Sequence, residues 1–269
     1  MYSGKGGRLL SGYILCQTKK ADLPYFIENI STNIYTLEEL CYYLYHNLYL
    51  IDETIINEEL CDWIQNELNL GRLAAKLRTV LGKFSSAEDI LYPVFKEINY
   101  LTYEELKVLN GRIQQLDRES LPVREKQKGD ALMENGMYVH AIQVYQKLLE
   151  RKDLNEFREG IEESICHNLG CAYSYLFQME KALECFWRAY ETDHERKRLK
   201  TYLLAVHSIR SRADYEKTAS ELGADKELME EIAGELRDFA SRPHPAAEEE
   251  PSDILLEDLT KKYHRATGS

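Results

Sequence analysis

The residue types that bind zinc gather at one place in the second half of the chain. They are Cys166, His167, Cys171 and Cys185. Structural zinc sites pair their thiolates at short spacings such as C-x₂-C. The spacing of Cys166 and Cys171 does not match that pattern. We therefore interpret the four as small packing or groove-lining residues and expect no bound metal.

The start of the chain carries the other chemical signature, Gly4-Lys5-Gly6-Gly7. A phosphate-binding loop has the pattern G-x-x-x-x-G-K-[ST] between a strand and a helix, and that frame is missing here. Carboxylates are plentiful, but they stand at helix starts and on polar faces. With no pocket that would pair them for acid–base work, we expect no enzyme activity and no cofactor.

Charge and composition narrow the classes of partner. The 269 residues contain 34 Lys and Arg against 46 Asp and Glu, a net charge of −12. That balance disfavours nucleic acid and anionic membrane surfaces as partners. Residues 1–120 hold 12 basic and 17 acidic side chains, and we interpret their local basic patch as a solvated helix face. The patch consists of Arg72, Lys76, Arg78 and Lys83.

Targeting signals are weak. The polar stretch Met1–Gly7 precedes an apolar run that is too short for the core of a signal peptide. No window approaches the length of a membrane span, so we expect no membrane segment. The six cysteines lie in apolar helical patterns, and we expect reduced thiols in a cytoplasmic protein.

The first 118 residues predict a helical bundle. Thr36 is expected to cap a helix with Glu38 and Glu39 in its first turn, and Thr102 with Glu105 forms a capping box. Ser85 or Ser86 would cap another helix. Apolar residues recur at helical spacing in five segments, 37–51, 56–68, 73–81, 87–98 and 102–113. The only predicted strand is Tyr13–Cys16.

One helix of this bundle is rich in tyrosine. Tyr42, Tyr43, Tyr45 and Tyr49 stand beside the leucine stripe that already supplies a core face. A helix that is apolar nearly all round is typical of the centre of a bundle. Tyrosines are also enriched at interfaces, so a homodimer through Tyr42–Tyr49 is the alternative.

Two segments of the second half align with each other. Small residues recur at Gly129 and Gly170 and at Ala141 and Ala182, and aromatic residues follow at Tyr145 and Phe186. This pattern resembles the tetratricopeptide repeat over about residues 120–222. In that family the small residues let the two antiparallel helices of a repeat approach closely. Equivalent positions are 41 apart here, so we expect longer helices around Arg151–Glu163.

The resemblance also implies a binding face. In the family the first helix of each repeat lines a concave groove that holds a protein or peptide. The corresponding positions here are Lys126, Asp130, Asn168, Cys171, Tyr175 and, near a third repeat, Arg198. One subclass grips a peptide carboxylate with Lys and Asn at such positions. Asp130 departs from that pattern, because its negative charge would repel a carboxylate.

The chain after the two repeats changes character. Leu199–Ile209 and Asp214–Leu222 predict a degenerate third repeat. Leu228, Ile232, Leu236 and Phe239 would form one face of a capping helix. Pro243, Pro245, Pro251 and an acidic run then indicate a disordered linker before a short helix at 254–263.

The expected fold is all-α: an N-terminal helical bundle, a short α-solenoid similar to tetratricopeptide repeats, and a flexible tail. The expected divisions are residues 1–118, 119–240 and 241–269. The expected function is a non-enzymatic scaffold that binds a protein or peptide through the concave face. The alternative is a peptide-sensing signalling regulator with the N-terminal bundle as its output domain, a layout that some bacterial regulators share.

Overall fold

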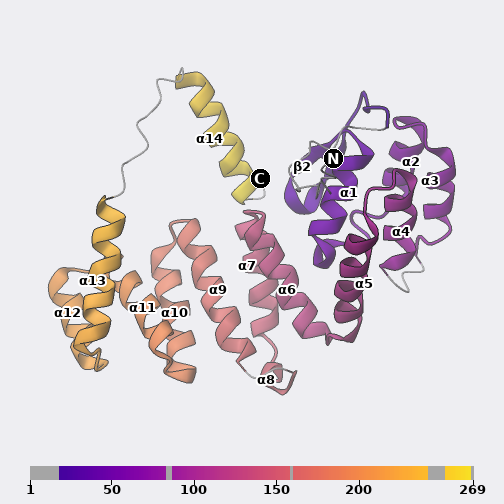
Figure 1. The fold of residues 1–269 in the computed structure, drawn as a ribbon. Coiled ribbons are helices and arrows are strands. Elements are labelled where there is room, and N and C mark those ends of the chain that lie inside the picture. Colours follow the sequence, from indigo (N-terminus) through magenta and orange to yellow (C-terminus); the bar gives the residue numbers. More distant parts are fainter. Residues whose placement is uncertain (1–17, 83–86, 158–159, 242–251, 268–269) are drawn as a thin grey trace, which may run out of the picture. The chain divides into compact units, whose positions relative to one another are not determined.

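The computed structural model describes residues 18–82, 87–157, 160–241 and 252–267 (Figure 1). It is 74% helical, and the predicted all-α class is confirmed. The chain divides into two compact units, Met1–Arg118 and Glu119–Ser269. None of the helices in the described part of the chain is long and apolar enough to cross a membrane.

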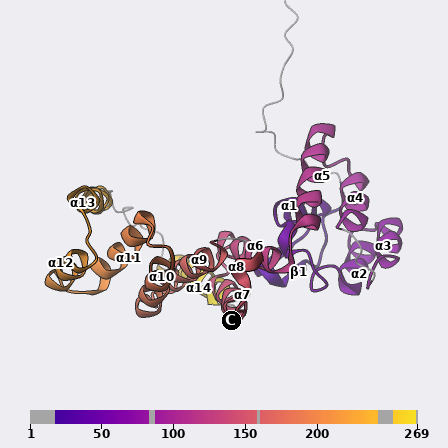
Figure 2. The same ribbon diagram turned by 90° about the horizontal axis from the view of Figure 1, so that it is seen from below.

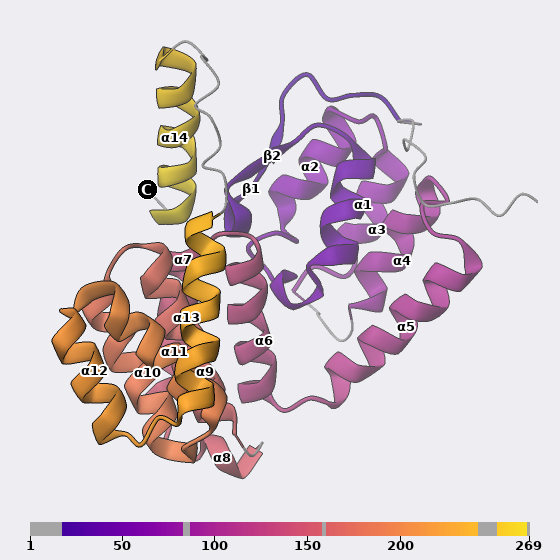
Figure 3. The ribbon, with the colours of Figure 1, turned by 60° about the vertical axis from the view of Figure 1, so that its left-hand side comes forward.

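The first unit is a helical bundle that carries one small hairpin. Its helices pack on one another in the order α2, α3, α4 and α1 (Figure 3). The α-helices are α1 (Leu37–His46), α2 (Glu58–Asn66), α3 (Gly71–Arg78), α4 (Glu88–Glu97) and α5 (Tyr103–Arg118). Short 3₁₀ turns occupy Glu28–Ile30 and Leu48–Leu50.

The predicted N-caps Thr36 and Thr102 are confirmed. Thr36 and Glu39 form a full capping box at the start of α1. Thr102 and Glu105 form the same reciprocal bonds before α5, with Thr102 N donating to Glu105 Oε2 at 2.7 Å. Asn47 ends α1 earlier than the leucine stripe predicts, because its side-chain amide donates to the Tyr43 carbonyl at 3.0 Å. Ser85 and Ser86 lie outside the described residues.

The hairpin consists of β1 (Tyr25–Ile27) and β2 (Thr32–Ile34), paired antiparallel with Tyr25 opposite Ile34. No local pattern in the sequence predicts this hairpin, and the predicted strand Tyr13–Cys16 lies outside the described residues. Contacts distant in sequence hold the hairpin. The Tyr25 hydroxyl donates to the Ile55 carbonyl at 2.8 Å, and the Tyr25 ring lies 5.8 Å from that of Trp63.

The tyrosine-rich helix is mostly a packing element. Tyr43 is buried, Tyr45 and Tyr49 are half-buried, and Tyr42 is exposed. Burial raises the pKa of Tyr43 well above its ordinary value. A surface that joins two copies through this helix would therefore rest mainly on Tyr42.

The predicted basic patch is partly neutralised. Arg78 pairs with Glu58 at 3.0 Å and with Asp62, and it also donates to Gln65. Lys83 lies outside the described residues.

In the second unit, neighbouring helices from α6 to α12 lie side by side, with one short helix inserted (Figures 1 and 2). The two repeats are the pairs α6 (Leu121–Glu134) with α7 (Tyr138–Leu149) and α9 (Ile161–Tyr175) with α10 (Met179–Asp193). The remaining helices are α8 (Leu154–Phe157), α11 (Arg196–Ile209), α12 (Arg212–Glu221), α13 (Lys226–Ser241) and α14 (Ser252–Thr267).

The prediction of longer helices around Arg151–Glu163 is wrong, because the additional residues between the repeats do not lengthen the helices. They form the separate short helix α8, whose Leu154 is buried. Gly160, with φ of 72°, then stands in the left-handed region before α9 begins. The insertion thus packs against α6 and α9 as a helix of its own and leaves the helices of the repeats at 12 to 15 residues.

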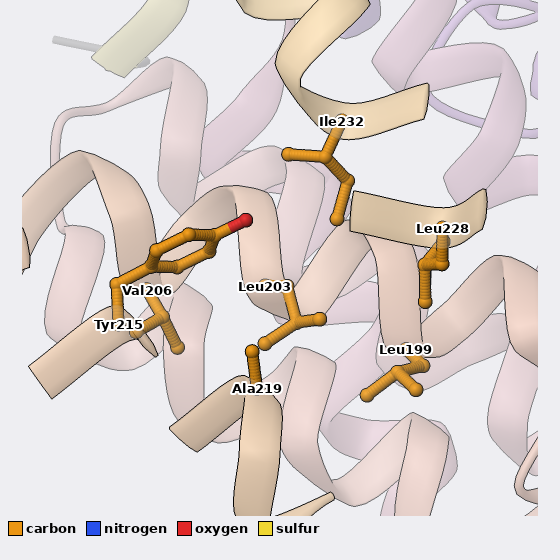
Figure 4. Packing of buried hydrophobic residues seen from close by; sticks show 7 residues of the cluster. All are labelled: Leu199, Leu203, Val206, Tyr215, Ala219, Leu228 and Ile232. Carbon is orange, nitrogen blue, oxygen red and sulfur yellow. The ribbon is translucent and has the colours of Figure 1, made fainter. Parts of the chain in front are cut away.

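The third pair and the cap share one core (Figure 4). Side chains of α11, α12 and α13 meet there: Leu199, Leu203, Val206, Tyr215, Ala219, Leu228 and Ile232. The predicted helices are confirmed. The predicted face of the cap is wrong at its end, because Phe239 is 71% exposed while Leu236 packs against the cluster. The predicted linker prolines lie outside the described residues, and α14 begins at Ser252.

Candidate functional site

The carboxylate of Asp130 is the centre of a polar network between the two repeats. Its Oδ1 accepts from the Tyr145 hydroxyl at 2.7 Å and from the Asn168 side-chain amide at 2.8 Å. Its Oδ2 accepts from the Lys126 ammonium, one helical turn earlier on α6. The network therefore joins α6, α7 and α9 through one side chain.

This network uses three of the residues that the sequence analysis assigned to the groove. Lys126 and Asp130 keep only 14% and 22% of their side-chain surface exposed. A partly buried pair with additional hydrogen bonds is held more firmly than a surface pair. The Lys126 charge is thus already neutralised, and a carboxylate-binding role for Lys126 and Asn168 would require Asp130 to release them.

Two tyrosines of the array, one half-buried and one exposed, stack on each other. The rings of Tyr138 on α7 and Tyr175 on α9 stack with centroids 4.4 Å apart and planes within 1°. Tyr175 is nevertheless 61% exposed. Burial, and then the neighbouring Tyr175, raises the pKa of Tyr138. A stacked ring that remains open to solvent is pre-positioned to contact a partner.

The remaining predicted residues lie on α9 and α11. Cys171 Sγ is 3.8 Å from His167 Nε2 on the same helix, and burial raises the pKa of the thiol. Burial, followed by the nearby Arg198 and Lys197, lowers the pKa of His167. Arg198 pairs with Asp193 and donates to the Glu163 carbonyl at 3.2 Å, so its charge is used inside the array.

The structure adds two residues that the sequence analysis did not assign to a site. Tyr138 supports the Tyr175 ring, and Phe177 is 90% exposed in the turn after α9. Phe177 has φ of 56°, an unusual conformation for a bulky residue. The sequence could have indicated Phe177, because an apolar ring in the turn of a repeat is unusual. The stacking of Tyr138 depends on how the repeats pack and carries no local signal.

The cysteine and histidine cluster does not assemble into a metal centre in the described part of the chain, where no group of three or more His, Cys, Asp and Glu side chains is placed to hold an ion. Burial raises the pKa of Cys166 to about 11 and that of Cys185 to about 12. These thiols are therefore protonated near neutral pH, which suits packing.

Comparison with known proteins supports the repeat. The sequence model of the tetratricopeptide repeat matches residues 163–193, which correspond to α9 and α10. No curated protein and no solved structure matches the chain. The array thus contains a tetratricopeptide repeat segment, a motif that generally mediates contacts between proteins.

Proposed function

We propose that the chain is a non-enzymatic adaptor that binds a protein or peptide on the first-helix face of its array. By first-helix face we mean the side of α6 and α9 that carries Lys126, Asp130, Cys171 and Tyr175, of which Tyr175 is the most exposed. We also propose a cytoplasmic location, which rests on the sequence alone.

The observation that carries this proposal is the exposed Tyr138–Tyr175 stack. An aromatic ring that is already immobilised loses little conformational entropy when a partner covers it. Tyrosine is also among the residues that contribute most of the binding free energy at interfaces. Phe177, in the turn after α9, would extend the apolar contact.

Besides the exposed tyrosine stack, the first-helix face has a polar network that fixes its shape. Asp130 ties Lys126, Tyr145 and Asn168 together, so the spacing of α6 and α9 is set before a partner arrives. We assign Lys126 and Asp130 a supporting role, with partial exposure of both charges at the surface. This mixture of signs favours a partner segment that carries both charges rather than a bare carboxylate.

The test begins with affinity capture by the full chain, followed by calorimetry with the partner that mass spectrometry identifies. Tyr175→Ala is expected to weaken binding by about 2 kcal/mol, because the ring is the proposed anchor. The matched control is Tyr103→Ala, which removes a tyrosine of α5 that is more exposed than Tyr175, 80% against 61%. Tyr42→Ala examines the alternative surface.

The proposal fails if Tyr175→Ala binds like the parent chain while Tyr42→Ala abolishes binding. The tyrosine-rich helix α1 would then be the interaction surface. Loss of binding in Tyr175→Ala alone supports the first-helix face.

A further inference from the structure

A concave site lies in the first unit, between α4 and α5. It is an open cavity of about 530 Å³. Small-molecule sites are typically concave, mostly apolar and of roughly 300–1,000 Å³, with a few converging polar groups. The cavity lies within the first unit, so it is separate from the first-helix face.

The walls of the cavity are apolar and firmly held. Phe95 is buried and stacks on Tyr100, with ring centroids 5.8 Å apart and planes within 18°. The Phe95 ring also meets the Tyr45 ring edge-on, with ring centroids 6.5 Å apart. Leu101 and Leu106, both half-buried, complete the apolar lining. A ligand would therefore meet rings and leucine side chains that are already fixed.

A hydrogen bond joins the two helices that flank the cavity. The Tyr92 hydroxyl on α4 donates to Asn110 Oδ1 on α5 at 2.5 Å. Burial first, and Glu88 second, raises the pKa of Tyr92. Glu88, whose charge contributes to this shift, is not part of the lining.

The residues that line the cavity carry a positive charge, whereas the whole chain is negatively charged. Lys96 is the one charged residue among those that line the cavity, and among the described residues it forms no ion pair. Asn99, at the end of α4, adds an exposed amide to the same rim. A protein of net charge −12 thus places an unneutralised ammonium and an amide at the mouth of an apolar cavity.

We propose that this cavity binds a small amphipathic monocarboxylate. The apolar body of the ligand lies against Phe95, Leu101 and Leu106, where it loses contact with water. The carboxylate accepts hydrogen bonds from the Lys96 ammonium and the Asn99 amide at the rim. A cationic ligand is disfavoured by Lys96, and a neutral one leaves the ammonium without a new partner.

The experiment titrates the full chain with three probes that share one apolar body: octanoate, 1-octanol and octylamine. The readout is the shift of the side-chain amide signals of Asn99 and Asn110 in ¹⁵N-labelled protein. Octanoate is expected to bind roughly 1.5- to five-fold more tightly than octanol, the range for an exposed ion pair. Octylamine should bind most weakly.

Variants connect the preference to the site. Lys96→Gln should remove the advantage of octanoate over octanol, and Lys96→Arg should restore it. Lys107→Gln, a neighbouring lysine outside the lining, is the matched control and should change nothing. Leu106→Trp should fill the cavity and abolish binding of all three probes.

The inference is overturned if octanoate leaves both amide signals unmoved in the parent chain. It is overturned equally if the three probes bind with the same affinity, or if Lys96→Gln retains the octanoate preference. Circular dichroism spectra and melting curves of each variant show that a loss of binding does not come from unfolding.

Discussion

The ring of Tyr145 lies so close to Gly129 that a Cβ atom on the glycine would overlap ring carbon Cε1. Phe186 and Gly170 repeat the relationship at 2.6 Å in the next helical pair. Each aromatic side chain thus packs against the glycine of its own repeat. The buried alanines Ala141 and Ala182 complete the close approach. These contacts explain why the small residues and the rings recur together.

Replacing Gly170 by Ala should lower the free energy of unfolding by about 1–3 kcal/mol, because the new Cβ overlaps the Phe186 ring. Gly234→Ala is the matched control, since its Cβ would meet no atom within 4 Å on helix α13. There the same change should be neutral or stabilise by up to roughly 1 kcal/mol. Urea unfolding of both variants measures the difference. Equal stabilities would contradict the packing described for the repeat.

Asp130→Ala should destabilise the array by about 1–3 kcal/mol, because Lys126, Tyr145 and Asn168 lose their shared acceptor. Asp153→Ala removes a more exposed carboxylate that pairs with Arg151 at 2.8 Å. Its cost should stay below about 1 kcal/mol. Thermal unfolding of both variants distinguishes a network from a surface pair, and similar losses would refute the central role of Asp130.

The stability of the second unit should fall as the pH is lowered through the range in which histidine titrates. Burial lowers the pKa of His167 below its ordinary value of 6.5. The unfolded chain therefore binds a proton more readily than the folded chain, and acid favours unfolding below about 6.5. Melting temperatures between pH 8 and pH 5, compared with those of His167→Gln, measure the effect. If the His167→Gln variant keeps the pH profile of the parent chain, His167 is not the source of the pH dependence of stability.

Removing the residues after Ser241 should leave the melting temperature nearly unchanged. The described leucines of α14, Leu256 and Leu259, are mostly exposed, so their removal forfeits little buried surface. Differential scanning calorimetry of the full and shortened chains makes the comparison. A drop of many degrees would show that α14 is an integral element of the fold.

The sequence by itself determined most of the helices, the N-caps of α1 and α5 and the repeat, whereas the short helix α8 was not expected. Helical periodicity and caps depend on residues three or four positions apart, as Thr36 with Glu39 illustrates. The sequence also aligned Gly170 and Phe186 with Gly129 and Tyr145, whereas the packing of each ring against the glycine of its own repeat was decided by the tertiary structure. The sequence indicated which residues gather near the first-helix face, although their function remains a prediction.

Only the tertiary structure decided what those residues contact. Asp130 meets Asn168 because two repeats pack against each other, and nothing local to either residue indicates that bond. The hairpin at Tyr25 forms through contacts with Ile55 and Trp63, whereas the local apolar run predicted a strand at Tyr13–Cys16, outside the described residues. The cavity beside Lys96 arises between α4 and α5. In each case the contact depends on how separate elements pack, which periodicity within one element does not specify.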